Sequence, residues 1–154
     1  QIPSKPPYSI NASVIYDSFI NDLNSMILIK NQNEYNIKYI LGLLNSKIIS
    51  YWFNFTFGKM QRKLFPQFKI KELLEFPIKK INFTNLNNRK LHDILTNLVD
   101  QMLEVQKKYH ESKTEQDKNH YKKQIDIIDR QIDQLVYELY GLTEEEIKIV
   151  EENV

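Results

Sequence analysis

The residues with the clearest chemical potential lie between Lys47 and Lys80, where cations alternate with aromatic side chains. The cations of this stretch are Lys47, Lys59, Arg62, Lys63, Lys69, Lys71, Lys79 and Lys80. Only Glu72 and Glu75 oppose them. Lysine and arginine neutralise backbone phosphates, and a glutamine amide can pair with the edge of an adenine. We therefore predict that loop residues in this stretch contact DNA, namely Lys59, Gln61, Arg62, Lys63, Gln67 and Lys69.

The aromatic side chains of the same stretch have two possible uses. Exposed rings can stack on the bases of a single strand. Large aromatic residues are, however, more often buried, and we expect Trp52, Phe53 and Phe65 to belong to a core. The loops that carry the cations would then be held by this aromatic core.

The charge of the chain is strongly asymmetric although its net value is only +1. Residues 1–90 contain 13 Lys or Arg against 5 Asp or Glu, whereas residues 91–154 contain 8 against 15. This split indicates that only the first half meets a polyanion such as DNA. Chance clustering of charge on solvated faces is the alternative explanation.

Other groups that could do chemistry do not form a catalytic constellation. Lys5-Pro6-Pro7-Tyr8 resembles the Asn-Pro-Pro-Tyr motif of amino-methyltransferases, but lysine replaces the asparagine and no glycine-rich nucleotide-binding turn accompanies it. The three histidines lack the i, i+4 spacing of a helical zinc site, and the chain has no cysteine. We therefore expect no catalytic residue, no metal site and no cofactor in this segment.

The elements that would position these residues are expected to form an α+β fold. Short strands are predicted at residues 13–16, 18–20 and 25–30, and apolar residues spaced by three and four predict a helix at residues 35–53. We divide the chain into a mixed α/β recognition head at residues 1–82, a helical hairpin at 83–141 and a short helix at 142–154.

The predicted hairpin follows from two apolar seams with heptad spacing. The seams consist of Leu91, Leu95, Leu98, Met102, Val105 and Tyr109, and of Tyr121, Ile125, Ile128, Ile132, Leu135 and Leu139. A polar stretch separates them, which favours an antiparallel, coiled-coil-like hairpin over one long helix that pairs with another chain. Gly141 is expected to end the second helix, and Thr143 with Glu146 to form a capping box for the last one.

Three sequence features together resemble a known family. They are the helix with Tyr39-Ile40-Leu41-Gly42-Leu43-Leu44-Asn45-Ser46-Lys47, the stretch from Phe57 through Gln61, and Leu64 to Leu73 followed by Phe76-Pro77-Ile78. They resemble the TaqI-like C-terminal specificity domain of adenine-specific DNA methyltransferases and type IIG restriction-modification enzymes. Residues 132–143 are also similar to the ending of many such proteins.

The resemblance implies a target-recognition head that docks in the major groove of double-stranded DNA, joined through helices to the rest of a bacterial enzyme. The first residues carry no signal-peptide pattern, so we expect a cytoplasmic segment of a larger chain, without contact to a membrane. The methyltransferase and nuclease domains of that chain would use S-adenosylmethionine and Mg²⁺. The alternative is a protein-interaction module whose hairpin docks a partner subunit or associates weakly with itself.

Overall fold

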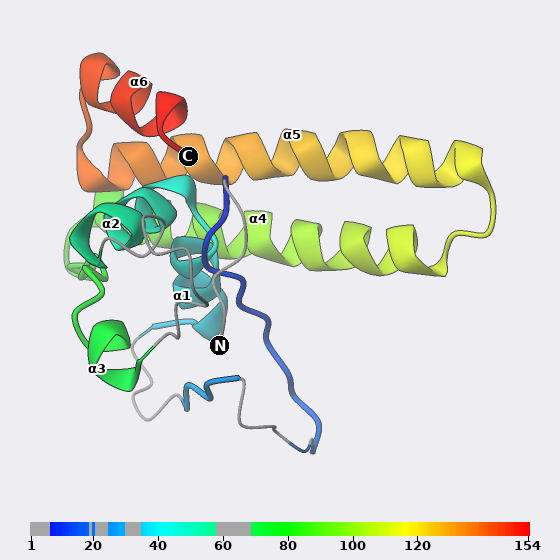
Figure 1. Cartoon of the computed structure of the whole chain (residues 1–154), viewed down its shortest axis with the longest axis horizontal. Coiled ribbons are helices and arrows are strands. Elements are labelled where there is room, and N and C mark those ends of the chain that lie inside the picture. Colours follow the sequence, from blue (N-terminus) through cyan, green and yellow to red (C-terminus); the bar gives the residue numbers. More distant parts are fainter. Residues whose placement is uncertain (1–6, 19, 21–24, 30–34, 58–68) are drawn as a thin grey trace.

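The computed structural model of the chain describes residues 7–18, 20, 25–29, 35–57 and 69–154. Its regular elements are α1 (Ile37–Leu44), α2 (Lys47–Phe57), α3 (Ile70–Leu73), α4 (Leu86–Glu111), α5 (Glu115–Tyr140) and α6 (Glu144–Glu152) (Figure 1). No strand occurs among these described residues. The predicted α+β fold is therefore wrong, and the chain is helical.

The segments predicted as strands lack a partner to pair with. Residues 13–16 and 25–29 have no regular structure, and a strand exists only where a neighbour accepts its backbone hydrogen bonds. Ile15, Ile27 and Leu28 are about half exposed, and Ile29 is more so. The apolar runs that favoured strands are thus not covered by a sheet, and β propensity alone does not make one.

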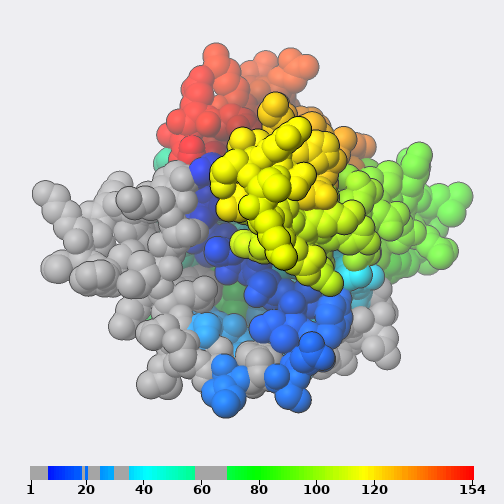
Figure 2. All heavy atoms as spheres, turned by 90° about the vertical axis from the view of Figure 1, so that its right-hand side faces the viewer, coloured from blue at the N-terminus to red at the C-terminus, as the bar shows by residue number. Residues whose placement is uncertain are grey.

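The two longest helices, α4 and α5, form an antiparallel hairpin that projects from the rest of the molecule (Figures 1 and 2). Asn85 caps α4 by accepting the backbone N–H groups of Asn87 and Asn88, and Thr114 caps α5 by accepting that of Asp117. Each helix has 26 residues, which corresponds to about 39 Å at about 1.5 Å per residue. The two stretches with heptad spacing therefore face each other within one chain.

The helix predicted at residues 35–53 is two helices. Asn45 ends α1, and Ser46 lies at the corner before α2, where its hydroxyl donates to the Leu43 carbonyl at 2.7 Å. Serine and asparagine compete with the helix for backbone hydrogen bonds, which is why an apolar periodicity can continue across a break that these residues create.

One hydrophobic core joins the first half of the chain to the hairpin. Tyr39, Leu41 and Leu43 from α1 lie in one cluster with buried residues of α4 and α5. The cluster members contributed by the hairpin are Leu95, Val99, Ile128, Ile132, Val136 and Leu139. Each Å² of apolar surface buried in this core stabilises the folded state by about 25 cal/mol. Packing therefore fixes α1 on the hairpin.

A second cluster surrounds α2. Phe53 and Ile49 are fully buried there beside Phe76, and the ring of Trp52 meets the rings of Phe57 and Phe76 edge to face. The core role predicted for Phe53 is confirmed, while Trp52 is partly buried and packs against the same cluster. Phe65, predicted to share it, lies outside the described residues.

The C-terminal end follows the sequence expectations closely. Gly141 has the left-handed φ of 74° that glycine tolerates best. Thr143 accepts the backbone N–H of Glu146, whose carboxylate accepts the backbone N–H of Thr143 in return.

Among the described residues, no helix has the length and apolar character that a bilayer span requires.

The helices α1 and α4 approach each other closely at Gly42. A Cβ atom at this position would lie 2.9 Å from Cγ2 of Val99 and 3.0 Å from Cδ1 of Leu95, both of which are buried. Gly42→Ala gains about 1 kcal/mol of helix propensity, but overpacking of a core costs about 1–3 kcal/mol. We expect the clash to dominate and the free energy of unfolding to fall by about 1 kcal/mol, as measured by urea denaturation.

Thr56→Ala is the matched control for this prediction. Thr56 is exposed near the end of α2, so the change improves helix propensity without meeting another helix. Its free energy of unfolding should stay the same or rise slightly. A Gly42→Ala protein as stable as the Thr56→Ala protein would contradict the close-packing argument.

Candidate nucleic-acid interface

The corner between α1 and α2 holds the N-terminal segment in place. The side-chain amide of Asn45 binds the backbone of Ala12 twice: its Oδ1 accepts the N–H at 2.8 Å and its Nδ2 donates to the carbonyl at 3.0 Å. The Ser50 hydroxyl accepts the backbone N–H of Ser9 at 3.0 Å. These bonds replace the partners that a neighbouring strand would have supplied.

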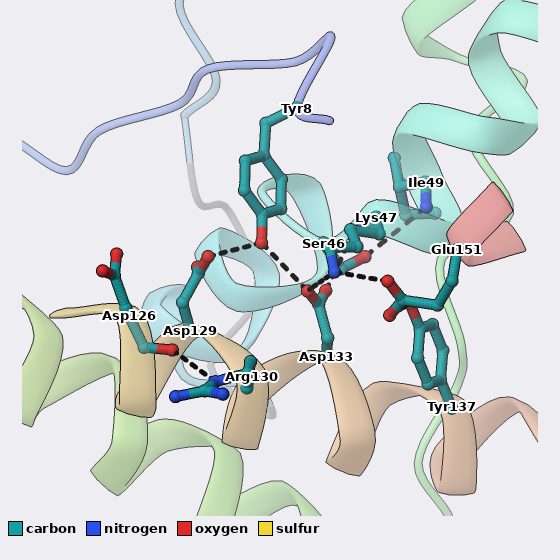
Figure 3. Close-up of polar contacts among 10 residues, drawn as sticks. All are labelled: Tyr8, Ser46, Lys47, Ile49, Asp126, Asp129, Arg130, Asp133, Tyr137 and Glu151. Atoms are coloured by element: carbon teal, nitrogen blue, oxygen red, sulfur yellow. Dashed lines mark hydrogen bonds and ion pairs between the residues drawn. The ribbon is translucent and has the colours of Figure 1, made fainter. Parts of the chain in front are cut away.

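A buried carboxylate from α5 lies at the N-terminus of α2 (Figure 3). Oδ1 of Asp133 accepts the backbone N–H of Lys47 at 2.9 Å, and Oδ2 accepts the hydroxyl of Tyr8 at 3.0 Å. Free N–H groups and the helix dipole favour an anion at this position. Burial nevertheless dominates and raises the pKa of Asp133 to about 6, although the bonds from Lys47 and Tyr8 act in the opposite direction.

Tyr8 links this carboxylate to a second one. Its hydroxyl also donates to Asp129, which lies one turn before Asp133 on α5. Burial raises the pKa of Asp129 above its usual range, while the hydrogen bond from Tyr8 lowers it. Burial, followed by the bond to Asp129, raises the pKa of the Tyr8 hydroxyl, so it remains a donor.

The ammonium group of Lys47 connects the same site to α6. Nζ of Lys47 lies 2.6 Å from Oε2 of Glu151 and 3.8 Å from Oδ2 of Asp133. Oε1 of Glu151 accepts the hydroxyl of Tyr137 at 2.8 Å. Burial opposes ionisation of Glu151, but the bonds from Lys47 and Tyr137 outweigh it and lower the pKa of this carboxyl.

We call the network of Tyr8, Lys47, Asp129, Asp133 and Glu151 the polar joint. It brings together the N-terminal segment, α2, α5 and α6. Each of its carboxylates accepts hydrogen bonds from neighbours in the joint. Its chemistry is that of a structural connection, since its donors and acceptors are directed at one another. No group of three or more potential metal ligands occurs among the described residues.

The polar joint was not predicted from the sequence. Tyr8 stood out there only as part of a methyltransferase-like motif. One signal was present: Asp129 and Asp133 each follow a seam isoleucine, Ile128 and Ile132, and so lie at the edge of the apolar face. Residues beside a seam contact whatever packs along it.

Five of the six residues predicted to contact DNA lie outside the described residues: Lys59, Gln61, Arg62, Lys63 and Gln67. Lys69, the sixth, is exposed at the start of α3, and its backbone N–H donates to Glu72 at 2.9 Å. Since only one of the six residues is described, the structure does not show whether they lie together. Their DNA contacts stay predictions.

The described cations within residues 35–80 fall into two classes. Lys38 and Lys47 form ion pairs, with Asp100 and with Glu151 and Asp133. Four others are exposed and form no ion pair with another described residue: Lys69, Lys71, Lys79 and Lys80. We call these four the head lysines. They lie around α3 and the extended segment after it, at the opposite end of the molecule from the tip of the hairpin (Figure 1).

The described residues thus form a helical module that has exposed lysines at one end and the polar joint at its centre. Residues 10–78 match the family model described as the TaqI-like C-terminal specificity domain. This match confirms the resemblance inferred from the sequence for that segment, slightly less than half of the chain. The hairpin and residues 132–143 lie outside it. No curated protein and no solved structure gives a match.

By its description, the matched family model is that of a specificity domain. The motifs that carried the resemblance have structural functions here. Asn45 and Lys47 hold other segments, and the carbonyl of Pro77 accepts the hydroxyl of Tyr140 at 2.6 Å. These three residues therefore attach the head to the rest of the structure.

The raised pKa of Asp133 predicts a pH dependence of stability. The pKa is about 6 in the folded protein and 3.8 as its ordinary value, so the folded state binds this proton more tightly than the unfolded state. The free energy of unfolding should then decrease as pH rises from about 4 to about 6. The contribution is on the order of 2 kcal/mol. Chemical denaturation at several pH values measures it.

Asp133→Asn should remove this decrease, because the amide cannot ionise while its oxygen still accepts the Lys47 N–H. The matched control is Asp126→Asn on the same helix, an exposed carboxylate that pairs with Lys122 at the surface. This control should keep the wild-type dependence. Parallel stability curves for the wild type and Asp133→Asn between pH 4 and 6 would contradict the prediction.

Proposed function

We propose that residues 10–78 read double-stranded DNA as the sequence-specific target-recognition domain of a restriction-modification enzyme. The observation that carries the proposal is the match of this segment to the specificity-domain family. The head lysines support it, since exposed cations without an ion pair among the described residues are free to neutralise phosphates. The segment between α2 and α3 contributes the predicted base contacts from Gln61 and Gln67.

The catalytic steps belong, in this proposal, to other domains of the same bacterial enzyme. We propose an N6-adenine methyltransferase domain that uses S-adenosylmethionine and an endonuclease domain that uses Mg²⁺. The segment itself would act without a cofactor, in the cytoplasm. Its contribution to the reaction is to position those domains at one DNA sequence.

The electrostatic part is tested by the double variant Lys69→Gln, Lys71→Gln. Each phosphate contact contributes about −0.9 to the slope of log K against log salt on duplex DNA. If both lysines contact phosphates, the slope becomes shallower by about 1.8, and affinity at low salt falls. Fluorescence anisotropy with a labelled duplex, repeated over a range of salt concentrations, measures both quantities.

The matched control removes two exposed cations from two other helices. Arg130→Gln, Lys148→Gln changes the net charge equally on α5 and α6. It should leave the salt slope unchanged. Equal effects of the two double variants would show that net charge, and not the surface around α3, determines the affinity.

The base-reading part requires the complete enzyme. There, Gln61→Ala should relax or change the sequence that is methylated, because loss of one bidentate base contact costs about 1–3 kcal/mol of discrimination. Lys71→Gln should weaken methylation of all sites alike. Mapping of methylated adenines in DNA from cells that express each variant compares the two, and an unchanged site with Gln61→Ala would remove this residue from the readers.

A further inference from the structure

The tip of the hairpin has a charge opposite to that of the helices that carry it. We define the hairpin tip as residues 107–123, which include the end of α4, the turn and the start of α5. The tip contains six lysines against three carboxylates, whereas the rest of residues 91–154 contains two cations against twelve carboxylates. The hairpin tip is therefore positively charged, although the rest of this half of the chain is acidic.

Half of the tip lysines form ion pairs, all of them at the surface. Lys107 pairs with Glu111 at 3.9 Å, Lys118 with Glu115 at 3.2 Å and Lys122 with Asp126 at 2.8 Å. Lys108, Lys113 and Lys123 are exposed and pair with no other described residue. Exposed pairs contribute only about 0–1 kcal/mol and are easily exchanged, so the positive charge of the tip is available to a ligand.

Helix electrostatics explain only part of this charge. Cations near the C-terminus of α4 are favoured by its dipole, which accounts for Lys107 and Lys108. The N-terminus of α5 disfavours cations, yet Lys113 directly precedes its N-cap residue, Thr114, and Lys118 lies in its first turns. The carboxylates that suit this dipole are Glu115 and Asp117 in the first turn, so the dipole does not account for Lys113 and Lys118.

The tip also lacks the surface that a protein partner needs. The large apolar residues that are exposed among the described residues include none from the tip, and the nearest, Ile94 and Ile127, lie along the helices. Specific protein interfaces have an apolar or aromatic centre. Phosphates need only cations with room to approach, which the projecting tip provides on several sides (Figure 2).

We propose that the hairpin tip binds the phosphate backbone of duplex DNA, as a second contact on the same duplex that the head reads. The proposal rests on the proposed function for its ligand, but on different residues. The long helices set the distance. About 39 Å of helix corresponds to about 11 base pairs at about 3.4 Å each, so head and tip together need a duplex clearly longer than one turn.

The test compares two triple variants of the whole chain. The tip variant is Lys108→Gln, Lys113→Gln, Lys123→Gln. The control is Asn97→Asp, Gln101→Glu, Gln131→Glu, which changes the net charge by the same amount at exposed positions of α4 and α5 outside the tip. Equal thermal unfolding by circular dichroism establishes that both are folded. Anisotropy then gives affinity against salt for a 30-base-pair duplex and a 10-base-pair duplex, lengths of about 3 turns and about 1 turn.

On the long duplex, the tip variant should show a salt slope shallower by about 2–3 and an affinity at least about tenfold lower at low salt. The control should stay close to the wild type. On the short duplex, where the two contacts compete for the same phosphates, wild type and tip variant should bind much more equally. This dependence on length is what a distant second contact produces and a general charge effect does not.

Three results would overturn the proposal: an unchanged slope for the tip variant on the long duplex, an equal loss in the control, or an equal loss on both duplexes. Sedimentation adds a fourth. A dimer that the tip variant abolishes, with DNA affinity intact, would show that the tip binds the acidic surface of a second copy.

The variants of the head separate this proposal from the proposed function. A smaller slope for Lys69→Gln, Lys71→Gln but not for the tip variant rejects the tip contact alone. The reverse result supports the tip contact and rejects the phosphate role of these head lysines.

Discussion

A buried carboxylate must be compensated by hydrogen bonds and charge, and at Asp133 this requirement organises the molecule. Lys47, the first residue of α2, contributes its backbone N–H and its ammonium group, and Tyr8 contributes its hydroxyl. The Lys47 ammonium also binds Glu151 on α6. Loss of one partner would leave the others partly unsatisfied at a cost of several kcal/mol. The polar joint thus sets the orientation of α2 on the hairpin, while the shared apolar core supplies most of the contact area.

Attachment of the head and its proposed contact with DNA involve different residues. The Asn45-Ser46-Lys47 corner and the Phe76-Pro77 turn face inward, toward Ala12, Asp133 and Tyr140. The head lysines face solvent. The inward residues are constrained by several partners at once, so substitutions there are expected to destabilise the fold. Substitutions at exposed positions away from such contacts usually change the free energy of unfolding only slightly.

The helices were predictable where periodicity was long and local. The spacing of the two seams predicted α4 and α5. Gly141 predicted the end of α5, and Thr143 predicted the start of α6. The break at Asn45-Ser46 was not predicted, because the apolar spacing continues across it. Strands were predicted at residues 13–16, 18–20 and 25–30, and the described residues of these ranges form none. A run of β-branched and apolar residues does not reveal whether a pairing neighbour exists. Asp133 could not be identified as buried because its partner Tyr8 lies 125 residues away.

That separation has a consequence for how the protein forms on the ribosome. The hairpin consists of neighbouring segments and closes early, as local contacts form fastest. The bonds of Tyr8 to α5, and of Lys47 to Glu151 across 104 residues, must wait until α5 and α6 have emerged. Tyr8 and its neighbours therefore lack these bonds while the residues up to α5 are being made. If other domains precede the N-terminal segment in the same polypeptide, they have this interval in which to fold before the module closes beside them.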